Sequence, residues 1–496
     1  MVPSSSPKRL HRRQFVLGPR PVPQVKGWLE RSVGRLVLSH CPQLRVEEIC
    51  DRDGGSWLLL GFAVQTDPRL PPPLETLAAL KSTDVSKVTS SWAGRWLLIG
   101  QGKVYTDAAG LLNCFHGVGK DATMWASSSP AMIRELVLPA SSKAPAHKLS
   151  HNQGIDWFPP PQAGFPGIRR LLPSQVLVIS EGRVTGRPLL TPLDPSTDYE
   201  VLIESLEERL RTGLLAGLPA EGEAWLALTS GYDSRVLLAI AAASGLRVRT
   251  YTQTFPWMGL GDRLIPKQLA KEVGASHALI LPKTYSHSAA QLYRQHSAGH
   301  VADDLDFRFF SQGQWDFANE GDLCIRGHGV DMGRMRYFFD FPEALVSVDR
   351  LMEGFGQQPE ASIAAGVGDW LQWTSERLEE GIDWRHRLHI EQRKGGWLAS
   401  IEQALDLVDP VRFDPANAAD TYALLAAIPT SYRRESLHLI NLIERSFPAL
   451  LRFPVNPADD DFGRIRSLGH RIMLDPSLLF RGPIRKVRRM LSSLTP

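Results

Sequence analysis

A short loop between residues 228 and 235 combines glycine, hydroxyl and carboxylate side chains in a pattern that suits a phosphate ligand. The loop reads Leu228-Thr229-Ser230-Gly231-Tyr232-Asp233-Ser234-Arg235. A strand that ends in Ser-Gly and turns directly into a helix presents backbone N–H groups and the positive end of a helix dipole to an anion. The hydroxyls of Thr229, Ser230 and Ser234 add donors. This pattern predicts a pyrophosphate-binding loop.

Asp233 gives the loop a second chemical property. A carboxylate inside a ring of anion-binding donors repels phosphate unless a cation lies between them, and Mg²⁺ is the cation that bridges carboxylates and phosphates. The residue types therefore predict a magnesium nucleotide. The chain contains no G-x-x-x-x-G-K-[ST] sequence, so a Walker-type NTPase is not supported. The alternative is a Ser/Gly turn that Asp233 caps at the start of a helix.

The segments around this loop predict a parallel sheet. Residues 224–255 read as a buried strand, the loop, an apolar helix that Gly245 ends, and a second strand rich in β-branched residues. Before them, Thr197 and Glu200 form a capping-box pattern, and the following apolar residues repeat at helical spacing. We therefore expect a helix to open this unit. Its apolar positions are Ile203, Leu206, Leu210 and Leu214.

The first third of the chain predicts a different, strand-rich unit. Strands are expected over 57–64 and 92–99 and from residue 103, and a hairpin is expected from 176 onward. Proline-rich connections follow around 158–167 and 189–199. We expect an α+β unit over residues 1–190 and an α/β unit over residues 191–496.

Composition limits the class of protein. The chain has 496 residues, with 56 Lys and Arg against 53 Asp and Glu, so its overall charge does not indicate a nucleic-acid partner. No apolar run approaches the roughly 20 residues that cross a bilayer, and no secretory signal is evident. Four scattered cysteines without a C-x-x-C pair favour a reducing compartment. We expect a soluble, cytoplasmic enzyme.

The loop at 230–234 resembles that of the PP-loop ATP pyrophosphatases, and within them the asparagine synthetases, whose loop reads S-G-G-x-D-S. One glycine is missing here, whereas the Ser, Gly, Asp, Ser order is kept. The resemblance implies ATP and Mg²⁺ as cofactors and a Rossmann-like parallel sheet with additional C-terminal helices. The residues that it places at the nucleotide are Leu228, Ser230, Gly231, Tyr232, Asp233 and Ser234.

A second loop strengthens the resemblance. The family has G-E-G-x-D-E downstream, and this chain has Gly327-His328-Gly329-Val330-Asp331-Met332. By resemblance Gly327 lies at the nucleotide and Asp331 joins Asp233 on Mg²⁺ in catalysis. His328 and Met332 replace the two glutamates of the motif, which argues against asparagine synthesis itself. Taken alone, the segment also fits a flexible turn.

Two further residues between the loops match the family less closely. Gln253 lies near the position of the family's adenine contact, and Asp262 resembles the aspartate that opens the next helix.

The front unit resembles the Ntn-type, β-sandwich-like glutamine amidotransferase domain of the same enzymes. In that family the nucleophile is a cysteine at residue 1 of the mature chain, whereas here Met1 precedes Val2 and Pro3 and the first cysteine is Cys41. We therefore expect no glutaminase activity. Relatives that lack this cysteine, the β-lactam synthetases and lasso-peptide cyclases, adenylate a carboxylate and transfer it to an amine already present on the substrate.

The expected reaction is formation of an amide from a small-molecule or peptide carboxylate and an amine, with AMP and pyrophosphate as products. Tyr337, with Glu343 nearby, is by position a candidate to take the proton from the amine, although an aromatic packing role fits its Phe-rich surroundings better. A homodimer is possible. Three alternatives stay open: an inactive nucleotide-binding scaffold, an asparagine synthase that uses free ammonia, and tRNA thiolation, which would require a reactive cysteine.

Overall fold

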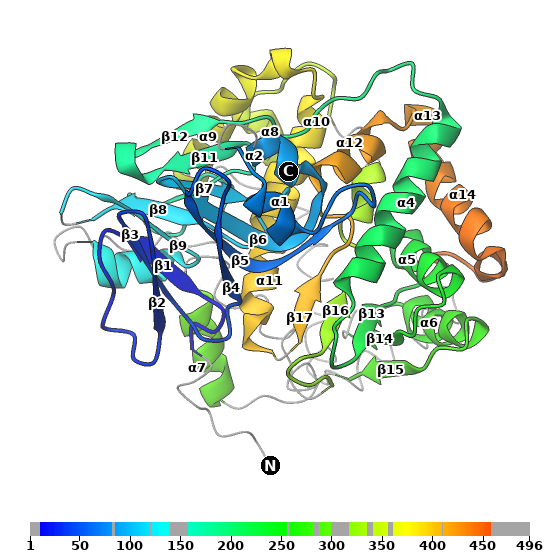
Figure 1. The fold of residues 1–496 in the computed structure, drawn as a ribbon. Helices are drawn as coiled ribbons and strands as arrows, with labels where there is room; N and C mark the ends of the chain where they lie inside the picture. The colour runs from blue at the N-terminus through cyan, green and yellow to red at the C-terminus, as the bar shows by residue number, and fades with distance from the viewer. Residues whose placement is uncertain are drawn as a thin grey trace, which may run out of the picture.

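The computed structural model describes residues 10–81, 85–119, 121–138, 157–254, 258–281, 287–298, 317–334, 341–355, 361–408 and 410–457. The chain forms two six-stranded antiparallel sheets and one five-stranded parallel sheet. In Figure 1 the antiparallel sheets lie on the left, in blue and cyan, and the parallel sheet lies at the lower right. The molecule is therefore an α/β protein in which strand direction separates the front half of the chain from the back half.

The two antiparallel sheets form a sandwich. The first has the order β10-β8-β9-β1-β3-β2, with β1(Phe15–Gly18), β2(Leu29–Val33), β3(Leu36–His40), β8(Phe115–Val118), β9(Met124–Ser127) and β10(Arg169–Arg170). The second has the order β12-β11-β7-β6-β5-β4, with β4(Val46–Cys50), β5(Ser56–Gln65), β6(Trp92–Gly100), β7(Lys103–Thr106), β11(Gln175–Val178) and β12(Arg183–Gly186).

Alternation along the strands builds the sandwich core. In β5, Leu58 and Leu60 face the first sheet, whereas Trp57 and Leu59 pack on the outer face. The expected strands over 57–64 and 92–99 and the hairpin after residue 176 are confirmed. The hairpin strand is shorter than expected, because the chain leaves the sheet at Val178 for a single 3₁₀ turn.

The parallel sheet has the order β15-β14-β13-β16-β17, with β13(Ala224–Ala227), β14(Arg249–Gln253), β15(His277–Ile280), β16(Leu323–Ile325) and β17(Val411–Phe413). Helices α5(Tyr232–Ala243) and α6(Leu260–Glu272) connect its first strands. The expected opening helix is α4(Tyr199–Gly217), but its cap is Asp198, which accepts the N–H of Glu200. The capping box predicted at Thr197 is wrong, because the Thr197 hydroxyl donates to the Asp194 carbonyl oxygen in the preceding turn.

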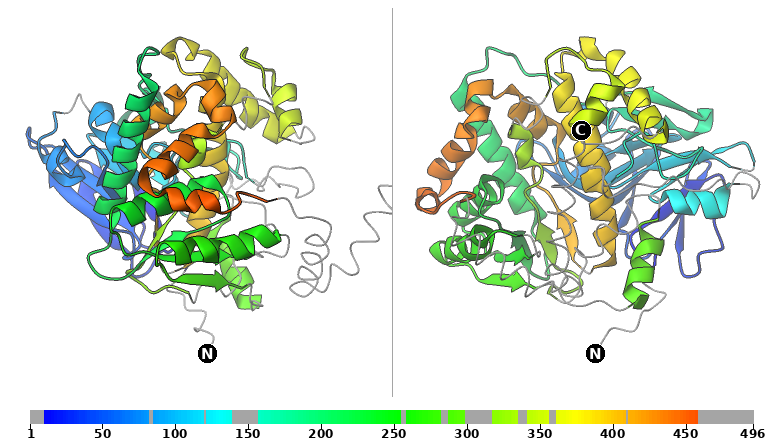
Figure 2. Two further views of the ribbon diagram at one scale, coloured as in Figure 1. Left: turned by 90° about the vertical axis from the view of Figure 1, so that its right-hand side faces the viewer. Right: turned by 180° about the vertical axis from the view of Figure 1, so that it is seen from behind.

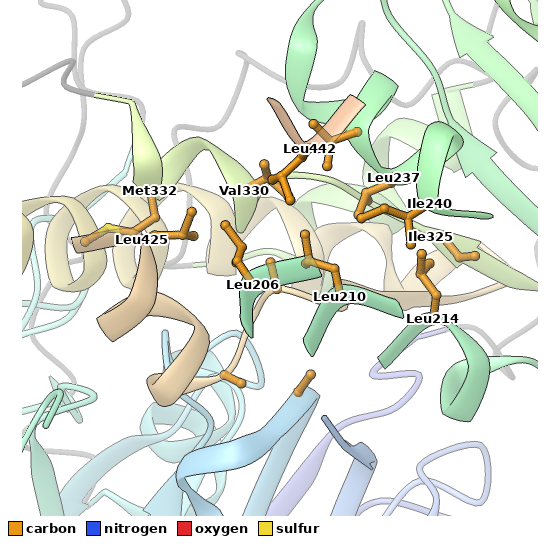
Figure 3. Packing of buried hydrophobic residues seen from close by; sticks show 14 of the residues in the cluster. Leu206, Leu210, Leu214, Leu237, Ile240, Ile325, Val330, Met332, Leu425 and Leu442 are labelled. Atoms are coloured by element: carbon orange, nitrogen blue, oxygen red, sulfur yellow. The ribbon is translucent and has the colours of Figure 1, made fainter. Parts of the chain in front are cut away.

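The main core lies between α4, α5 and the parallel sheet. Figure 3 shows Leu206, Leu210 and Leu214 of α4 facing Leu237 and Ile240 of α5, as their helical spacing predicts. Met332 packs in the same cluster beside Leu425. The residue that replaces the second glutamate of the resembled motif is therefore part of the core.

A continuous helical segment, Trp384–Ala404, crosses the middle of the molecule, and we term it the rod. It consists of α10(Trp384–Arg387), a π-helical stretch (Leu388–Leu398) and α11(Ala399–Ala404). Figure 2 shows it between the sandwich and the parallel sheet. The remaining helices are α1(Pro73–Ala78), α2(Val85–Val88), α3(Pro130–Met132), α7(His287–His296), α8(Val348–Gly354), α9(Ala361–Ser375), α12(Ala419–Ala427), α13(Thr430–Arg434) and α14(Leu437–Ser446).

Buried charges join the sandwich to the rod and the parallel sheet, and we term them the interface cluster. It consists of Arg95 from β6, Arg412 from β17, and Glu402 and Asp406 from the rod and the turn after it. Arg95 binds both oxygens of Asp406 at 2.7 Å, and Arg412 binds Asp406 at 2.9 Å and Glu402 at 2.6 Å. These pairs fix how the two halves meet.

In the part of the chain that the structure describes, no helix has both the length and the apolar character that a membrane span requires.

Candidate functional site

The two loops singled out in the sequence meet at the carboxyl edge of the parallel sheet. After β13 the chain adds β14 and β15 on one side, and β16 and β17 lie on the other, so the strand order reverses between β13 and β16. Open α/β sheets bind ligands at such a reversal. A Cβ atom on Gly327 would lie 3.4 Å from the backbone of Asp233, so the two loops touch. They form one crevice.

Side-chain hydrogen bonds shape the first loop from within. The Ser234 hydroxyl accepts the N–H of Thr229 at 3.0 Å, and the Thr229 hydroxyl accepts the N–H of Gly231 at 3.3 Å. Ser230 donates its N–H and its hydroxyl to Asp262 of α6, at 2.9 and 2.5 Å. Asp262 thus positions this loop, and the hydroxyl predicted to meet phosphate donates to a carboxylate.

Arg235 anchors the loop from below, a role that the sequence did not indicate. Its side chain is fully buried and donates to the Ser230 carbonyl oxygen at 2.9 Å. It also donates to the carbonyl oxygens of Leu450, Phe453 and Pro454. The segment that follows α14 is therefore fastened beneath the loop.

Asp233 lies in the first turn of α5 and faces the second loop. Its Oδ2 accepts a hydrogen bond from Arg334, whereas its Oδ1 is buried and has no hydrogen-bond partner among the residues that the structure describes. Burial raises the pKa of Asp233 to about 7; Arg334 opposes the rise and the nearby Asp331 carboxylate adds to it. The two aspartates of the predicted metal site therefore lie within electrostatic range of each other.

Asp331 lies in the short helical turn Val330–Gly333. Its Oδ1 accepts Lys394 Nζ at 2.5 Å and His389 Nε2 at 3.0 Å. Burial would raise the pKa of Asp331, but the Lys394 and His389 partners outweigh it and hold the pKa well below its usual range. Asp331 is therefore a fixed anion in the crevice.

Lys394 and His389, which both bind Asp331, could not be predicted from the sequence. On an α-helix with 3.6 residues per turn, two side chains that are five residues apart, as His389 and Lys394 are, would point about 140° away from each other. The π-helical stretch closes its hydrogen bonds over five residues, so both side chains reach the same aspartate. No residue pattern in the sequence indicates that this segment is π-helical rather than α-helical.

A cavity of about 280 Å³ opens beside the two loops. Leu228 and Gln253, two of the residues expected at the nucleotide, line it. The backbone of Leu228 is hydrogen-bonded to Tyr251 and Thr252 of the neighbouring strand, and Leu228 is also part of the main core cluster. The other lining residues are Ala227, Thr229, Tyr251, Thr252, Met258, Arg326, His328, Trp397, Leu398, Ile401 and Leu405.

Two polar residues in the cavity wall have few partners. Among the described residues the only hydrogen bond of the Arg326 side chain is to the Tyr251 hydroxyl, at 3.4 Å, and its nearest carboxylate is Glu402, at 3.9 Å. The Nδ1 of His328 is buried and has no partner in the described part of the chain, and burial lowers the pKa of His328 to about 3. The wall thus presents a cation and a neutral imidazole to a ligand.

The second loop is held by a residue that the sequence analysis did not consider. Asp414, at the end of β17, accepts the N–H of Gly329 at 2.5 Å and that of Ala416 at 3.0 Å. Burial raises the pKa of Asp414 to about 7. A Cβ atom on Gly329 would lie 2.8 Å from the Asp414 carboxylate, so the turn requires glycine.

The other expected site residues are less central. Tyr232 is partly buried and packs against the main core. Tyr337 lies outside the described residues. Glu343 is exposed, and its carbonyl oxygen accepts Trp384 Nε1 at 2.8 Å. Cys324 is buried in β16, and burial raises the pKa of its thiol to about 12.

The donor set fits a magnesium ion that arrives with phosphate ligands. The described residues contain no group of three His, Cys, Asp or Glu side chains that would hold a metal alone. They do provide two neighbouring carboxylates, and Oδ1 of Asp233 is a buried acceptor without a partner. Mg²⁺ commonly takes one or two carboxylates and completes its shell with phosphate oxygens and water. Asp233 and Asp331 would hold it here.

No protein-family model and no curated protein matches the chain. Solved structures that resemble it include an NMN synthetase from Francisella tularensis, at 15% identity and a TM-score of 0.19 over 40% of this chain and 95% of that one. Another is the allosteric regulatory enzyme of purine biosynthesis, at 12% identity and a TM-score of 0.25 over 73% of this chain and 89% of that one. At these scores neither likeness supports a statement about function.

Proposed function

We propose that this protein is an ATP-dependent, AMP-forming amide ligase of the asparagine synthetase type without a glutaminase of its own. The observation that supports this proposal most directly is the pair Asp233 and Asp331. The two carboxylates come from loops almost a hundred residues apart, and they meet at the point where the strand order reverses. A carboxylate pair at that edge, beside a cavity, suits a metal-bound nucleotide.

Each part of the crevice has a role in this proposal. The purine ring occupies the cavity lined by Leu228 and Gln253, whose walls are largely apolar. The triphosphate lies over the N-terminal turn of α5, where backbone N–H groups and the helix dipole favour anions. Asp233 and Asp331 hold Mg²⁺, which supplies positive charge to the departing pyrophosphate.

The proposed reaction has two steps. A substrate carboxylate oxygen bonds to the α-phosphorus while the bond to pyrophosphate breaks, which gives an acyl adenylate. An amine nitrogen then bonds to the acyl carbon, AMP leaves, and the amine loses a proton. Lys394 and Arg334 place two positive charges beside the aspartates, where they limit the repulsion between carboxylates and phosphate.

We place the source of the amine on the substrate rather than on glutamine. Cys41, the first cysteine, is buried at the end of β3, where its thiol donates to Gln43 Oε1 at 2.9 Å. Cys114 is also buried, and burial raises its pKa to about 12. Neither of these two thiols is an exposed nucleophile, and Cys50, which is exposed, ends the edge strand β4 of the sandwich.

Calorimetric titration with Mg²⁺ and an ATP analogue that cannot be cleaved between the α- and β-phosphates tests the proposal without a known second substrate. Wild type and Asp349→Asn, an exposed aspartate of α8, should bind the analogue equally. Asp233→Asn and Asp331→Asn should lose binding, and both should lose pyrophosphate release when carboxylates are screened.

A wild-type protein that binds no analogue would overturn the proposal and favour the scaffold alternative. Binding that survives in both aspartate variants would show that the nucleotide lies elsewhere.

A further inference from the structure

The two aspartates of the proposed site have cationic partners of very different kinds. Lys394 is 2% exposed and donates both to Asp331 and to the His328 carbonyl oxygen. Arg334 is 39% exposed, and among the described residues its side chain makes one hydrogen bond, to Asp233. One partner is enclosed by the protein, whereas the other reaches in from the open side of the crevice.

Lys394 cannot leave its place without cost. Its ammonium group lies inside the rod's packing, and moving it would leave Asp331 with His389 alone and a buried charge without a partner. His389 is itself only 8% exposed. Lys394 is therefore a permanent counter-ion of Asp331.

Arg334 has the freedom that Lys394 lacks. Its backbone is fixed, because its N–H donates to the Asp331 carbonyl oxygen at 2.9 Å and the preceding Gly333 packs closely against His438. Its long side chain is the part that can move. A guanidinium has five donors in a planar fork that matches phosphate oxygens, so it has an equally good partner as soon as phosphate is present.

The other oxygen of Asp233, Oδ1, is a place where a divalent cation could bind and displace Arg334. Oδ1 is buried and accepts no hydrogen bond from any described residue, so only one oxygen of the carboxylate is hydrogen-bonded there. A divalent cation bound at Oδ1 satisfies the carboxylate more completely than a single guanidinium contact does, and its double charge repels the guanidinium on the adjacent Oδ2. Cation and arginine therefore compete for Asp233.

We propose that Arg334 is an exchangeable counter-ion that holds Asp233 until a divalent cation arrives with the nucleotide, and that its guanidinium then moves to the phosphate oxygens. This inference rests on the proposed function for its second half only. The first half, competition between the cation and Arg334, concerns the free protein.

The proposal predicts effects of opposite sign in one variant. Arg334→Gln should bind Mn²⁺ more tightly than wild type in the absence of nucleotide, by roughly three- to tenfold, because the competing charge is gone. The same variant should bind the non-cleavable ATP analogue with magnesium more weakly, by roughly tenfold, because a charge-assisted contact to phosphate is lost. A residue with a purely structural role would not separate the two affinities in this way.

Two further variants serve as controls. Arg211→Gln removes an arginine of α4 that is 44% exposed and also bound to a carboxylate, Glu207, so it should change neither affinity. Arg334→Lys keeps the charge without the fork, and its Mn²⁺ affinity should stay near wild type while analogue binding falls. Thermal unfolding of each variant verifies that it is folded.

Electron paramagnetic resonance of free Mn²⁺ measures the first affinity, and calorimetry with the analogue measures the second, both on the full chain. An Arg334→Gln protein with unchanged Mn²⁺ affinity would overturn the exchange and make Arg334 a fixed contact. Tighter Mn²⁺ binding with unchanged analogue binding would overturn the transfer to phosphate. If wild type binds no analogue, the proposed function is wrong. The Mn²⁺ affinities of wild type and Arg334→Gln still show whether the cation and Arg334 compete for Asp233.

Discussion

The interface cluster and the crevice both bury charged side chains, but they differ in how completely those side chains are hydrogen-bonded. In the interface cluster Arg95 makes two parallel bonds to Asp406, and Arg412 bridges Asp406 and Glu402. In the crevice, Asp233 Oδ1, Arg326 Nε and His328 Nδ1 are buried and have no hydrogen-bond partner among the described residues. Most buried polar atoms in proteins are hydrogen-bonded, so these three atoms give the crevice hydrogen-bonding capacity that a ligand can use.

The difference separates two uses of buried charge. A fully paired cluster fixes the position of two surfaces, and its members are costly to remove one at a time. A partly paired cluster has spare hydrogen-bonding capacity, which a nucleotide and a cation can satisfy. The comparison can be tested by removing one charge at a time from each region.

The largest effect should come from Asp406→Asn. The change leaves Arg95 and Arg412 buried without their shared carboxylate, and it should lower the free energy of unfolding by about 3–5 kcal/mol. Denaturant unfolding measures the loss. The control is Asp369→Asn, whose ion pair with Arg169 is about half exposed and should be worth less than about 1 kcal/mol. Equal losses in both variants would remove the distinction between the cluster and the surface.

A smaller loss is expected for Lys394→Met. This change takes the main counter-ion from Asp331, which is one-third exposed, so water compensates in part and the free energy of unfolding should fall by about 1–3 kcal/mol. Nucleotide binding should fall with it, because the aspartate is no longer held in place. A variant with full stability and full binding would contradict the role of the rod in the crevice.

The pH dependence of stability should report on Asp414. Its pKa is raised to about 7 by burial, so the folded protein takes up a proton that the unfolded chain, with an ordinary carboxyl pKa, does not. Stability from this group is therefore full below about pH 4 and is lost as pH rises towards 7 and above. Asp414→Asn should gain stability relative to wild type as the pH rises through that window, by at most about 1.4 kcal/mol for each unit by which the pKa is raised.

Unfolding titrations of the two proteins at pH 4.5, 6 and 8 test this prediction. A constant difference between them across the range would contradict the raised pKa.

The smallest effect on stability should come from Arg326→Met. Its guanidinium has one long hydrogen bond, and Glu402 keeps Arg412 as a partner, so the loss should be within about 1 kcal/mol. Arg95→Met, the matched change in the interface cluster, should cost several times more. Calorimetry should show that Arg326→Met alters nucleotide affinity although stability is nearly unchanged. A large stability loss would place Arg326 with the interface cluster.

The sequence predicted those parts of the fold that depend on local pattern. Alternating and helical spacing located β5, β6 and α4, and strand–loop–helix order predicted the parallel sheet. The resemblance of two loops to the motifs of one family also predicted that these two turns would meet, and both follow strands of one sheet.

The parts that the sequence did not predict depend on contacts between distant residues. Arg95 and Asp406 are 311 positions apart, and neither lies in a recognisable motif. Lys394 and Asp331 are 63 positions apart, and they meet only because the rod widens into π-helical turns. The helix cap at Asp198 was missed by one residue, because a local turn had already used the Thr197 hydroxyl.

The rod also belongs structurally to the front unit. Arg170 of β10 donates to the carbonyl oxygens of Gly395 and Gly396, at 2.5 and 2.9 Å, directly after Lys394. Asn113, in the same unit, donates to the Ala399 carbonyl oxygen at 2.8 Å. Expressed by itself, the back half of the chain would lose the donors that support the lysine's position. The sandwich therefore supports the part of the rod that carries Lys394. A truncated protein without the sandwich should hold the side chains of the crevice less firmly.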